Sequence, residues 1–441
     1  VSKKRIIKNM KLKSIRDVEE INDILILEQS LSSNNKYLYS EVSTPYSIVK
    51  YLIDIIPIDE LRNKNNKFLD PGCGNGYISI YLYYILFNKL KYDFESFDLC
   101  SKHIIENMLY MIDININHIE YLHSLFNYKN NIVCIDFLKY DKDIVFDVII
   151  SNPPYIINMN EFSSSKKKEG YTIWPDFIKK SLKLLKKDGY LSTIIPSIWM
   201  KPDNIMHSII LSYEIKSLYC YNNTETNKIF KGLAQTPTSL FVLKNKSREN
   251  FIELYDKSFN LKINFPINNS IPVFGSYIIL KLLPYLQKFG NISKYVIKTN
   301  MPSTKIKFSN NCDETYMYKN IYTCKLEKNR AYLVYNYSDK ELPYCKKEKL
   351  ILGHKMYGFP FHDKNGSYGI SNRDNYIIIT TNLSRLKEFL DSKLVFYLYE
   401  STRYRMKYLE RFAFEYILDI NNDPFFPKNI NDASIFEYFK F

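Results

Sequence analysis

The chain has 441 residues, a formal net charge of +14 and 46% hydrophobic residues, which is an ordinary globular balance. Its length predicts two or three domains. The seven cysteines are odd in number and include no Cys-x-x-Cys pair, so we expect reduced thiols in an intracellular protein, with neither a disulfide framework nor a metal site. The longest apolar run, 77–87, is too short to cross a bilayer, and no signal peptide is recognisable, so we expect no membrane association and no secretion. The expected compartment is the cytoplasm, nucleoid or nucleus.

The charge is distributed unevenly along the chain. Residues 246–441 carry +10, residues 41–245 carry +1 and residues 1–40 carry +3. A basic face attracts the phosphates of nucleic acids, although a solvated lysine-rich surface gives the same count. We therefore predict three parts: a basic N-terminal tail and helix at 1–40, a domain at 41–245 and a basic domain at 246–441.

The predicted elements alternate between strands and helices as far as residue 245. Thr44 and Pro45 begin a helix, with Thr44 as its cap and Pro45 in its first turn. Strands are predicted at 67–70, 94–99, 131–135, 146–150, 190–195 and 238–243, and helices from 77, at 101–112 and at 177–185, the last with a C-cap signal at 186–189. This alternation predicts an α/β fold with a mainly parallel sheet covered on both faces. Beyond residue 245, short aromatic strands, turns and a helical stretch at 383–408 predict a separate α+β domain.

The segment Ser151-Asn152-Pro153-Pro154-Tyr155 follows the strand 146–150. Two consecutive prolines end the strand, because neither has an N–H to donate. One amide and one aromatic ring are thus displayed beyond the carboxyl end of a strand, where ligands bind in open α/β sheets. Taken alone, the segment is equally well explained as a strand-ending turn.

The loop after the first strand is rich in glycine and begins with an acid. It reads Asp70-Pro71-Gly72-Cys73-Gly74-Asn75-Gly76, and its glycines allow a tight turn and the close approach of a ligand. Asp70 favours a cationic ligand over a phosphate, and S-adenosylmethionine carries a sulfonium and an ammonium group. We expect Asp98, at the end of the predicted second strand, to bind ribose hydroxyls. The alternatives are a bare glycine turn and a helix N-cap at Asp98.

Asp136 and Phe137 follow the third strand, so the ends of all four strands point at one rim of the sheet. Each residue also has a purely structural explanation, Asp136 as an N-cap and Phe137 as a core residue. Their joint alignment on one rim favours a shared site.

Together these motifs resemble the adenine-specific DNA methyltransferases of restriction–modification systems, in the γ arrangement. The resemblance covers roughly residues 40–245 and rests, in chain order, on Thr44-Pro45, the loop 70–76, Asp98, Asp136-Phe137 and Asn152 to Tyr155. The sequence departs from the family's pattern at two places in the cofactor site. The family often has a second acid after the ribose-binding acid, where this sequence has Cys100 nearby, and it usually has a glycine before the Thr-Pro pair, which is missing before Thr44.

The resemblance implies a Rossmann-like, S-adenosylmethionine-dependent methyltransferase domain at 41–245 and a target-recognition domain for double-stranded DNA at 246–441. The residues it implies for cofactor binding are Thr44, Asp70, Pro71, Gly72, Cys73, Gly74, Gly76, Asp98, Asp136 and Phe137. The residues it implies for catalysis are Asn152, Pro153, Pro154 and Tyr155, with Tyr155 and Phe230 stacking on the target base. For Phe230, a place in the hydrophobic core is the alternative. A monomer is expected.

The expected reaction is transfer of a methyl group to N6 of an adenine that is flipped out of the duplex. The lone pair of this amine is conjugated with the ring, and acceptors at the Asn152 side chain and the Pro153 carbonyl would free it for in-line attack. An RNA base methyltransferase and a protein-glutamine methyltransferase are the alternatives, because their substrates present a similar nitrogen. The candidate DNA contacts of the basic domain are Lys346, Lys347, Lys349, Lys355 and Arg373.

Overall fold

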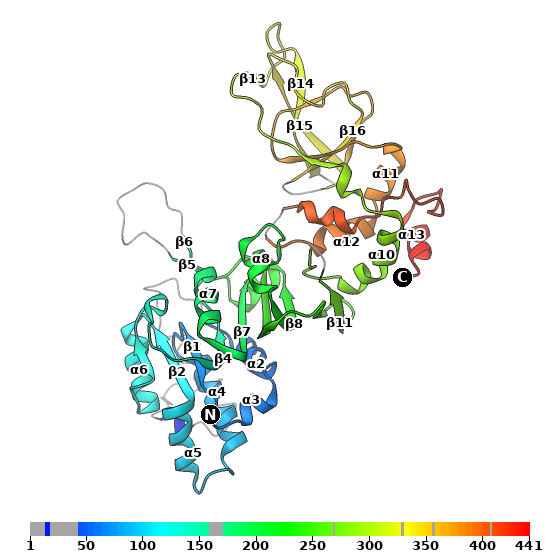
Figure 1. The fold of residues 1–441 in the computed structure, drawn as a ribbon. Helices are drawn as coiled ribbons and strands as arrows, with labels where there is room; N and C mark the ends of the chain where they lie inside the picture. Colours follow the sequence, from blue (N-terminus) through cyan, green and yellow to red (C-terminus); the bar gives the residue numbers. More distant parts are fainter. Residues whose placement is uncertain are drawn as a thin grey trace, which may run out of the picture. The chain divides into compact units, whose positions relative to one another are not determined.

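The structure, a computed structural model, describes residues 14–17, 43–157, 171–267, 270–327, 330–354, 358–405 and 408–441. The chain divides into two compact units, the first of Val1–Ser197 with Ile205–Tyr255 and the second of Ile198–Asn204 with Asp256–Phe441 (Figure 1). The sequence predicts a boundary after residue 245, whereas the units divide after Tyr255, because strand β10 (Phe251–Asp256) pairs with β8 (Tyr213–Tyr221) of the first unit. The predicted tail and helix at 1–40 lie outside the described residues, except around η2 (Ile15–Asp17).

The first unit is built on a mainly parallel sheet. Its strands are β1 (Phe68–Pro71), β2 (Leu109–Asp113), β3 (Ile132–Cys134), β4 (Phe146–Ser151), β7 (Leu185–Pro196), β8 (Tyr213–Tyr221), β9 (Thr238–Ser247) and β10. Within this unit their order is β3-β2-β1-β4-β7-β9-β8-β10. β9 is antiparallel to both of its neighbours. The strand order reverses between β1 and β4, and such a switch point opens a crevice at the carboxyl ends of the strands.

Helices pack against this sheet and against one another. They are α2 (Tyr46–Asp54), α3 (Ile58–Arg62), α4 (Tyr77–Leu90), α5 (Phe97–His103), α6 (Ile116–Phe126), α7 (Trp174–Leu184), α8 (Ile205–Ile210) and α9 (Asn223–Ile229). α2 and α3 lie against α4, α6 against β2 and β3, and α7 against β7. The apolar residues of α2 and α4 join those of β1, β2 and β4 in one large core. This arrangement is the Rossmann-like α/β fold that the sequence predicts.

The second strand lies further along the chain than the sequence predicts. The segment 94–99 contains three apolar residues, but Ser96 caps α5 by accepting a hydrogen bond from the Leu99 N–H, and Phe97 and Leu99 are exposed. The predicted helix at 101–112 instead passes through a π-helical turn, η3 (Ile104–Met108), into β2. The prediction of a strand at 94–99 is therefore wrong, because residues 97–99 belong to α5 and β2 takes the place in the sheet beside β1.

The predicted helix C-cap at 186–189 is also wrong. α7 ends at Leu184 and β7 starts directly at Leu185, with Asp188 in the left-handed region at a φ of 64°. Gly189 serves a different purpose, because a Cβ there would lie 2.7 Å from the carbonyl oxygen of Asp147. The glycine thus lets β7 approach β4 closely.

The second unit has the α+β character that the sequence predicts. Its strands are β11 (Leu261–Pro266), β12 (Val296–Lys298), β13 (Phe308–Ser309), β14 (Tyr318–Glu327), β15 (Arg330–Ser338), β16 (Lys349–Gly353), β17 (Phe361–Asp363), β18 (Gly369–Ile370) and β19 (Asn375–Ile378). Its helices are α10 (Ser276–Phe289), α11 (Leu383–Leu390), α12 (Lys393–Ser401) and α13 (Asp432–Phe439). Two four-stranded sheets, β12-β19-β16-β17 and β13-β15-β14-β18, share a small core of Ile321, Cys324, Ile351, Ile370 and Ile377.

Not all predicted DNA contacts of this unit lie on its surface. Lys349 is fully buried, and its ammonium group lies 2.5 Å from Asp363, whose carboxylate also accepts hydrogen bonds from the backbone N–H groups of Ser367 and Tyr368. Lys349 is therefore a structural residue, and its prediction as a DNA contact is wrong. Lys346 is exposed but forms an ion pair with Glu341.

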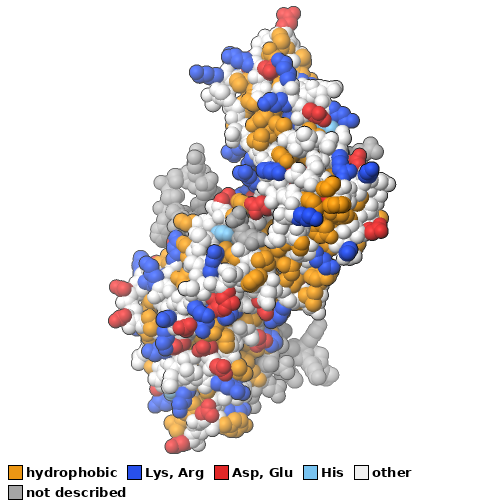
Figure 2. Space-filling view, turned by 45° about the vertical axis from the view of Figure 1, so that its right-hand side comes forward, with side chains coloured by type: hydrophobic (Ala, Val, Ile, Leu, Met, Phe, Trp, Pro, Cys, Tyr) orange, Lys and Arg blue, Asp and Glu red, His pale blue; other side chains and the backbone are white. Residues whose placement is uncertain are grey.

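Lys347 and Arg373 are exposed, whereas Lys355 lies outside the described residues. Figure 2 shows Lys and Arg side chains spread over the visible face and not gathered in a single patch.

Among the described residues, no helix is both long and apolar enough to span a membrane.

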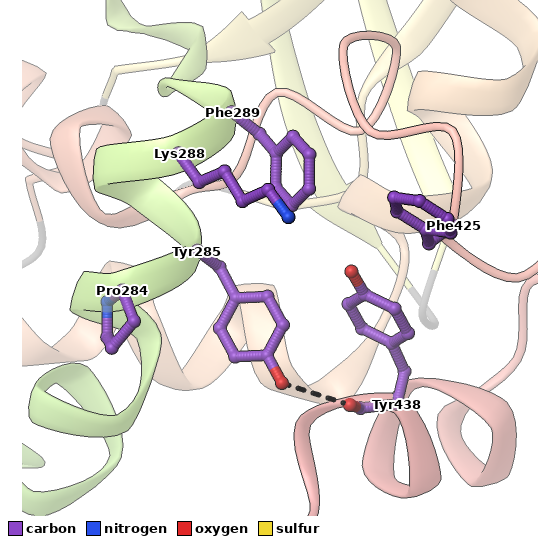
Figure 3. A pocket seen from close by; sticks show the side chains of 6 residues that line it. All are labelled: Pro284, Tyr285, Lys288, Phe289, Phe425 and Tyr438. Atoms are coloured by element: carbon purple, nitrogen blue, oxygen red, sulfur yellow. Dashed lines mark hydrogen bonds between the residues drawn. The ribbon is translucent and has the colours of Figure 1, made fainter.

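A small aromatic pocket of about 300 Å³ lies in the second unit. In Figure 3, Tyr285, Lys288 and Phe289 of α10 lie toward Phe425 and Tyr438, and Pro284 of the same helix also lines the pocket. The Tyr285 hydroxyl donates to the Tyr438 carbonyl, and the Lys288 ammonium lies over the rings of Phe289 and Phe425. None of the predicted site residues lines this pocket.

Candidate active site

The glycine-rich loop is tied to the end of β2 by backbone hydrogen bonds. The N–H groups of Gly72 and Cys73 both donate to the Ile112 carbonyl, and the Gly74 N–H donates to the Asp113 carboxylate at 2.8 Å. Gly72, Gly74 and Gly76 all have positive φ values, of 72°, 53° and 78°. At Gly76 a Cβ would also lie 2.4 Å from a methyl group of Leu122, so only glycine fits there.

Asp113, and not Asp98, is the acid at the end of the second strand. Asp113 closes β2, is almost fully buried, and accepts hydrogen bonds from the backbone N–H groups of Gly74 and Asn115. Asp98 lies in α5, where its exposed carboxylate forms an ion pair with Arg16. The assignment of Asp98 to this position is thus wrong for the same reason as the strand at 94–99. The signal for Asp113 was present in Leu109-Tyr110-Met111-Ile112-Asp113, an apolar run that ends in an acid.

The two carboxyl groups beside the loop differ in their pKa. The pKa of Asp70 is raised to about 7, mainly by burial and also by the nearby Asp113 charge, although the Ser79 hydroxyl, which donates to Asp70 Oδ2, opposes the shift. Asp70 Oδ1 is buried and has no hydrogen-bond partner among the described residues. For Asp113, burial also favours the neutral form, but hydrogen bonds from His118, Asn115 and Gly74 outweigh it and hold the pKa below its usual range. The site therefore contains one firmly ionised carboxylate and one carboxyl group that titrates near neutrality.

The Asn-Pro-Pro-Tyr segment lies beside this loop. β4 ends at Ser151, and a Cβ on Gly72 would lie 3.7 Å from Pro154 Cδ, so the loop and the segment are in close contact. The Tyr155 hydroxyl lies 3.5 Å from the Ile194 carbonyl of β7, and burial raises the Tyr155 pKa, which keeps the phenol neutral. The ends of β1 and β4 thus bring together the two motifs for which the sequence predicts one shared site.

Thr44 contacts Asn152 and does not cap α2. The N-cap of α2 is Pro45, without a side-chain hydrogen bond, so the prediction that Thr44 caps this helix is wrong. Instead, the Thr44 hydroxyl accepts a hydrogen bond from Asn152 Nδ2 at 3.0 Å. This contact places the start of α2 at the same site as the end of β4.

Asp136 and Phe137 have the structural roles that were considered as alternatives. Asp136 caps the 3-10 helix η4 (Phe137–Lys139) by accepting from the Leu138 N–H, and Phe137 is buried. Phe137 packs on Phe177 with a ring-centre distance of 5.1 Å, and Phe177 Cε1 would lie 3.4 Å from a Cβ on Gly72. Phe177 is thus a neighbour of the loop that was not among the predicted site residues.

Phe230 has no place beside Tyr155 as a stacking ring in this conformation. It is the C-cap residue of α9, is only 2% exposed, and belongs to the large hydrophobic core of the first unit. The structure thus favours the core alternative, because the ring is packed among apolar side chains and presents no free face.

The buried carboxyl group of Asp70 gives a testable pH dependence of stability. Its folded-state pKa of about 7 lies above the ordinary aspartate value of 3.8, so the folded state binds the extra proton and this contribution to stability disappears as pH rises through 7. We expect Asp70→Asn, compared with wild type, to gain stability between pH 4 and pH 8 by an amount on the order of 4 kcal/mol. Urea unfolding at several pH values measures this difference, and a difference that stays constant with pH would contradict the assignment.

Comparison with known proteins gives a match over a part of the chain that contains the glycine loop and the Asn-Pro-Pro-Tyr segment. Residues 53–230 match the model of a family described as Eco57I restriction-modification methylase. A search of curated proteins found no match. The family match confirms the resemblance to restriction–modification methylases, while the γ arrangement, the expected monomer and the expected compartment stay predictions.

Solved structures with similarity to the chain include two described as methyltransferases and one described as a modification subunit. A class I S-adenosylmethionine-dependent methyltransferase from Listeria monocytogenes is 16% identical over 62% of this chain and 80% of that chain, with a TM-score of 0.38. A modification subunit of a type I restriction enzyme from Vibrio vulnificus YJ016 is 13% identical over 66% and 64%, with a TM-score of 0.39. A type I restriction–modification methyltransferase subunit from Streptococcus thermophilus is 17% identical over 62% and 59%, with a TM-score of 0.36. The chain therefore spans less than two thirds of the last two proteins, and within it residues 53–230 are the segment that matches the methylase family.

Proposed function

We propose that the protein is an S-adenosylmethionine-dependent DNA methyltransferase that modifies the exocyclic N6 amine of adenine. The observation that carries this proposal is the contact between the glycine loop after β1 and the Asn152-Pro153-Pro154-Tyr155 segment after β4. One motif suits a cationic nucleoside cofactor and the other suits an amine, and methyl transfer needs both at one place.

The residues of the loop fit S-adenosylmethionine. The buried Asp70 Oδ1 has no partner among the described residues, and a carboxylate there would attract the positive charges of the cofactor. A Cβ on Gly74 would meet nothing within 4 Å, so space is open beside the loop. Asp113 closes β2 as an ionised carboxylate and takes the role that the sequence suggested for Asp98, binding ribose hydroxyls. The cofactor supplies an electrophilic methyl group when bound.

The chain's own contribution to the reaction is to make the target amine nucleophilic. The Nδ2 group of Asn152 is bonded to Thr44, which leaves the side-chain oxygen of Asn152 as an acceptor for one N–H of the amine. The Pro153 carbonyl accepts the second N–H. Two acceptors favour a pyramidal nitrogen with a localised lone pair, so no base has to remove a proton before the attack.

The target base must leave the duplex to reach this site. The ring of Tyr155 is held at the end of β4 by its position after two prolines and by its contact with β7. We assign Tyr155 the stacking contact with the flipped base, worth on the order of 1–3 kcal/mol. Phe230 is not part of this contact, since it is buried in the core.

The second unit is proposed to hold the DNA. Segment 246–441 carries +10 of the formal net charge of +14, and Lys347 and Arg373 are exposed within it. Lysine positions the phosphate backbone, whereas arginine also reads guanine edges. Lys349 is excluded from this role, because its charge is buried against Asp363.

The central test of the proposal is Asn152→Ala. Because Asn152 acts on the amine, we expect turnover to fall by roughly 10²–10³-fold, the range for removing one preorganised polar group at a reacting centre. Binding of S-adenosylmethionine, measured by calorimetry, should be retained. The assay follows labelled methyl transfer to unmethylated genomic DNA, with an RNA arm for comparison. Tyr155→Phe, which keeps the ring, is the matched control, and wild-type turnover in Asn152→Ala would refute the mechanism.

The corrected ribose contact is tested by a pair of acids. We expect Asp113→Asn to weaken S-adenosylmethionine binding, because it removes the charged acceptor that holds both the Gly74 N–H and the ribose. Asp98→Asn should leave binding unchanged, since Asp98 pairs with Arg16 on the surface. Calorimetry measures the affinity for S-adenosylmethionine in both variants. A loss of affinity in Asp98→Asn together with an unchanged affinity in Asp113→Asn would restore Asp98 to the site.

The DNA-binding role of the second unit is tested through salt dependence. Replacing Lys347 and Arg373 by Gln should lower the slope of log K against log salt by about 0.9 for each phosphate of duplex DNA that the variant no longer neutralises. Lys102→Gln, an exposed lysine of the first unit, is the control. An unchanged slope in the double variant would show that these two residues do not bind DNA.

A further inference from the structure

The hydrogen bond between Thr44 and Asn152 joins two segments that are far apart in the sequence. Asn152 follows β4 and Thr44 precedes α2, and the Nδ2–Oγ1 distance is 3.0 Å across 108 residues of chain. Both side chains are partly buried. The bond is therefore a tertiary contact between the start of a helix and the residue to which we assign the central role in catalysis.

The threonine hydroxyl is available for this contact because the helix does not use it. α2 begins at Tyr46 after Pro45, and the Pro45 carbonyl accepts from the N–H groups of Ile48 and Val49. The N-cap residue of this helix makes no side-chain hydrogen bond. Thr44 lies one residue before the N-cap Pro45, so its hydroxyl is outside the capping position and binds Asn152 instead.

An asparagine amide has two faces of opposite polarity, and only one suits an amine. The carbonyl oxygen accepts hydrogen bonds, whereas the amide nitrogen donates them, and the N–H groups of a target amine need acceptors. With Nδ2 directed at Thr44, the oxygen of Asn152 is turned away from Thr44 and is left to accept. If the amide were rotated by half a turn, its Nδ2 group would face the N–H groups of the target amine, and two donors would meet.

We propose that Thr44 is a positioning residue that holds the Asn152 amide with its oxygen toward the target amine. This inference rests on the proposed function and deepens it, since it names the group that binds the amide nitrogen of Asn152. Thr44 then acts through Asn152, in contrast to the cofactor-binding role that the family resemblance implies for it. The two roles differ in what they affect, because positioning controls the rate of methyl transfer and cofactor contact controls cofactor affinity.

The experiment compares Thr44→Val with Thr44→Ser in single-turnover methylation of unmethylated genomic DNA at saturating S-adenosylmethionine. Valine keeps the shape but removes the hydroxyl, so we expect a rate roughly threefold to tenfold lower, the change that matches one neutral hydrogen bond. Serine keeps the hydroxyl and should retain most of the rate. Calorimetry should give the same affinity for S-adenosylmethionine in both variants as in wild type.

Further variants separate this role from a general decrease in stability. Thr226→Val removes another buried threonine hydrogen bond of the first unit, the one with Thr238, and should not change the rate. If Thr44→Val does not fold, Thr44→Ala removes the same hydroxyl with less steric demand. In the Asn152→Ala background, Thr44→Val should cause no further decrease in rate.

Three results would overturn the inference. They are a wild-type rate in Thr44→Val, a rate in Thr44→Ser as low as in Thr44→Val, and a weakened cofactor affinity that accounts for the whole effect. The last would return Thr44 to cofactor binding. If the wild-type protein transfers no methyl group to DNA, the proposed function itself fails, and that result is distinct because it does not depend on residue 44.

Discussion

The hydrogen bonds between the glycine loop and the end of β2 are the constraint on which the site depends. Ile112 and Asp113 bind three successive N–H groups of the loop, from Gly72, Cys73 and Gly74. Because β1 lies between β2 and β4 in the sheet, a loop anchored to β2 on one side meets Pro154 after β4 on the other. Two motifs that are separate in the sequence thus lie side by side at the point where the strand order reverses.

Asp70 and Asp113, the two acids beside the glycine loop, show how burial and hydrogen bonding decide the charge of a carboxyl group. Asp113 has three donors and stays ionised, whereas Asp70 has the Ser79 hydroxyl on one oxygen and no partner among the described residues on the other. A buried carboxyl group with so few hydrogen-bond donors reduces the stability of the folded protein at neutral pH, because its ionised form is poorly solvated. A cationic ligand would remove that penalty, so a feature that is unfavourable for folding is favourable for binding.

The basic composition of the second unit has two physical origins that a charge count does not distinguish. Lys349 is neutralised by Asp363 inside the fold, where the pair orders the turn at Ser367 and Tyr368. Lys347 and Arg373 are exposed and remain candidates for phosphate binding. The distinction matters because an exposed charge is available to a polyanion, while breaking a buried pair leaves an uncompensated charge in the interior.

The sequence by itself determined the parallel α/β class, the glycine loop and the Asn-Pro-Pro-Tyr segment after β4, because these depend on local patterns of apolar residues, glycines and prolines. The tertiary structure decided which acid closes the second strand, where Phe230 is packed and what Thr44 contacts. The stretch 94–99 and the buried run 109–113 both combine apolar residues with an acid, and they are told apart only when their neighbours are known. A hydrogen bond between residues 44 and 152 leaves no pattern in either segment, since it arises only when the chain brings them together.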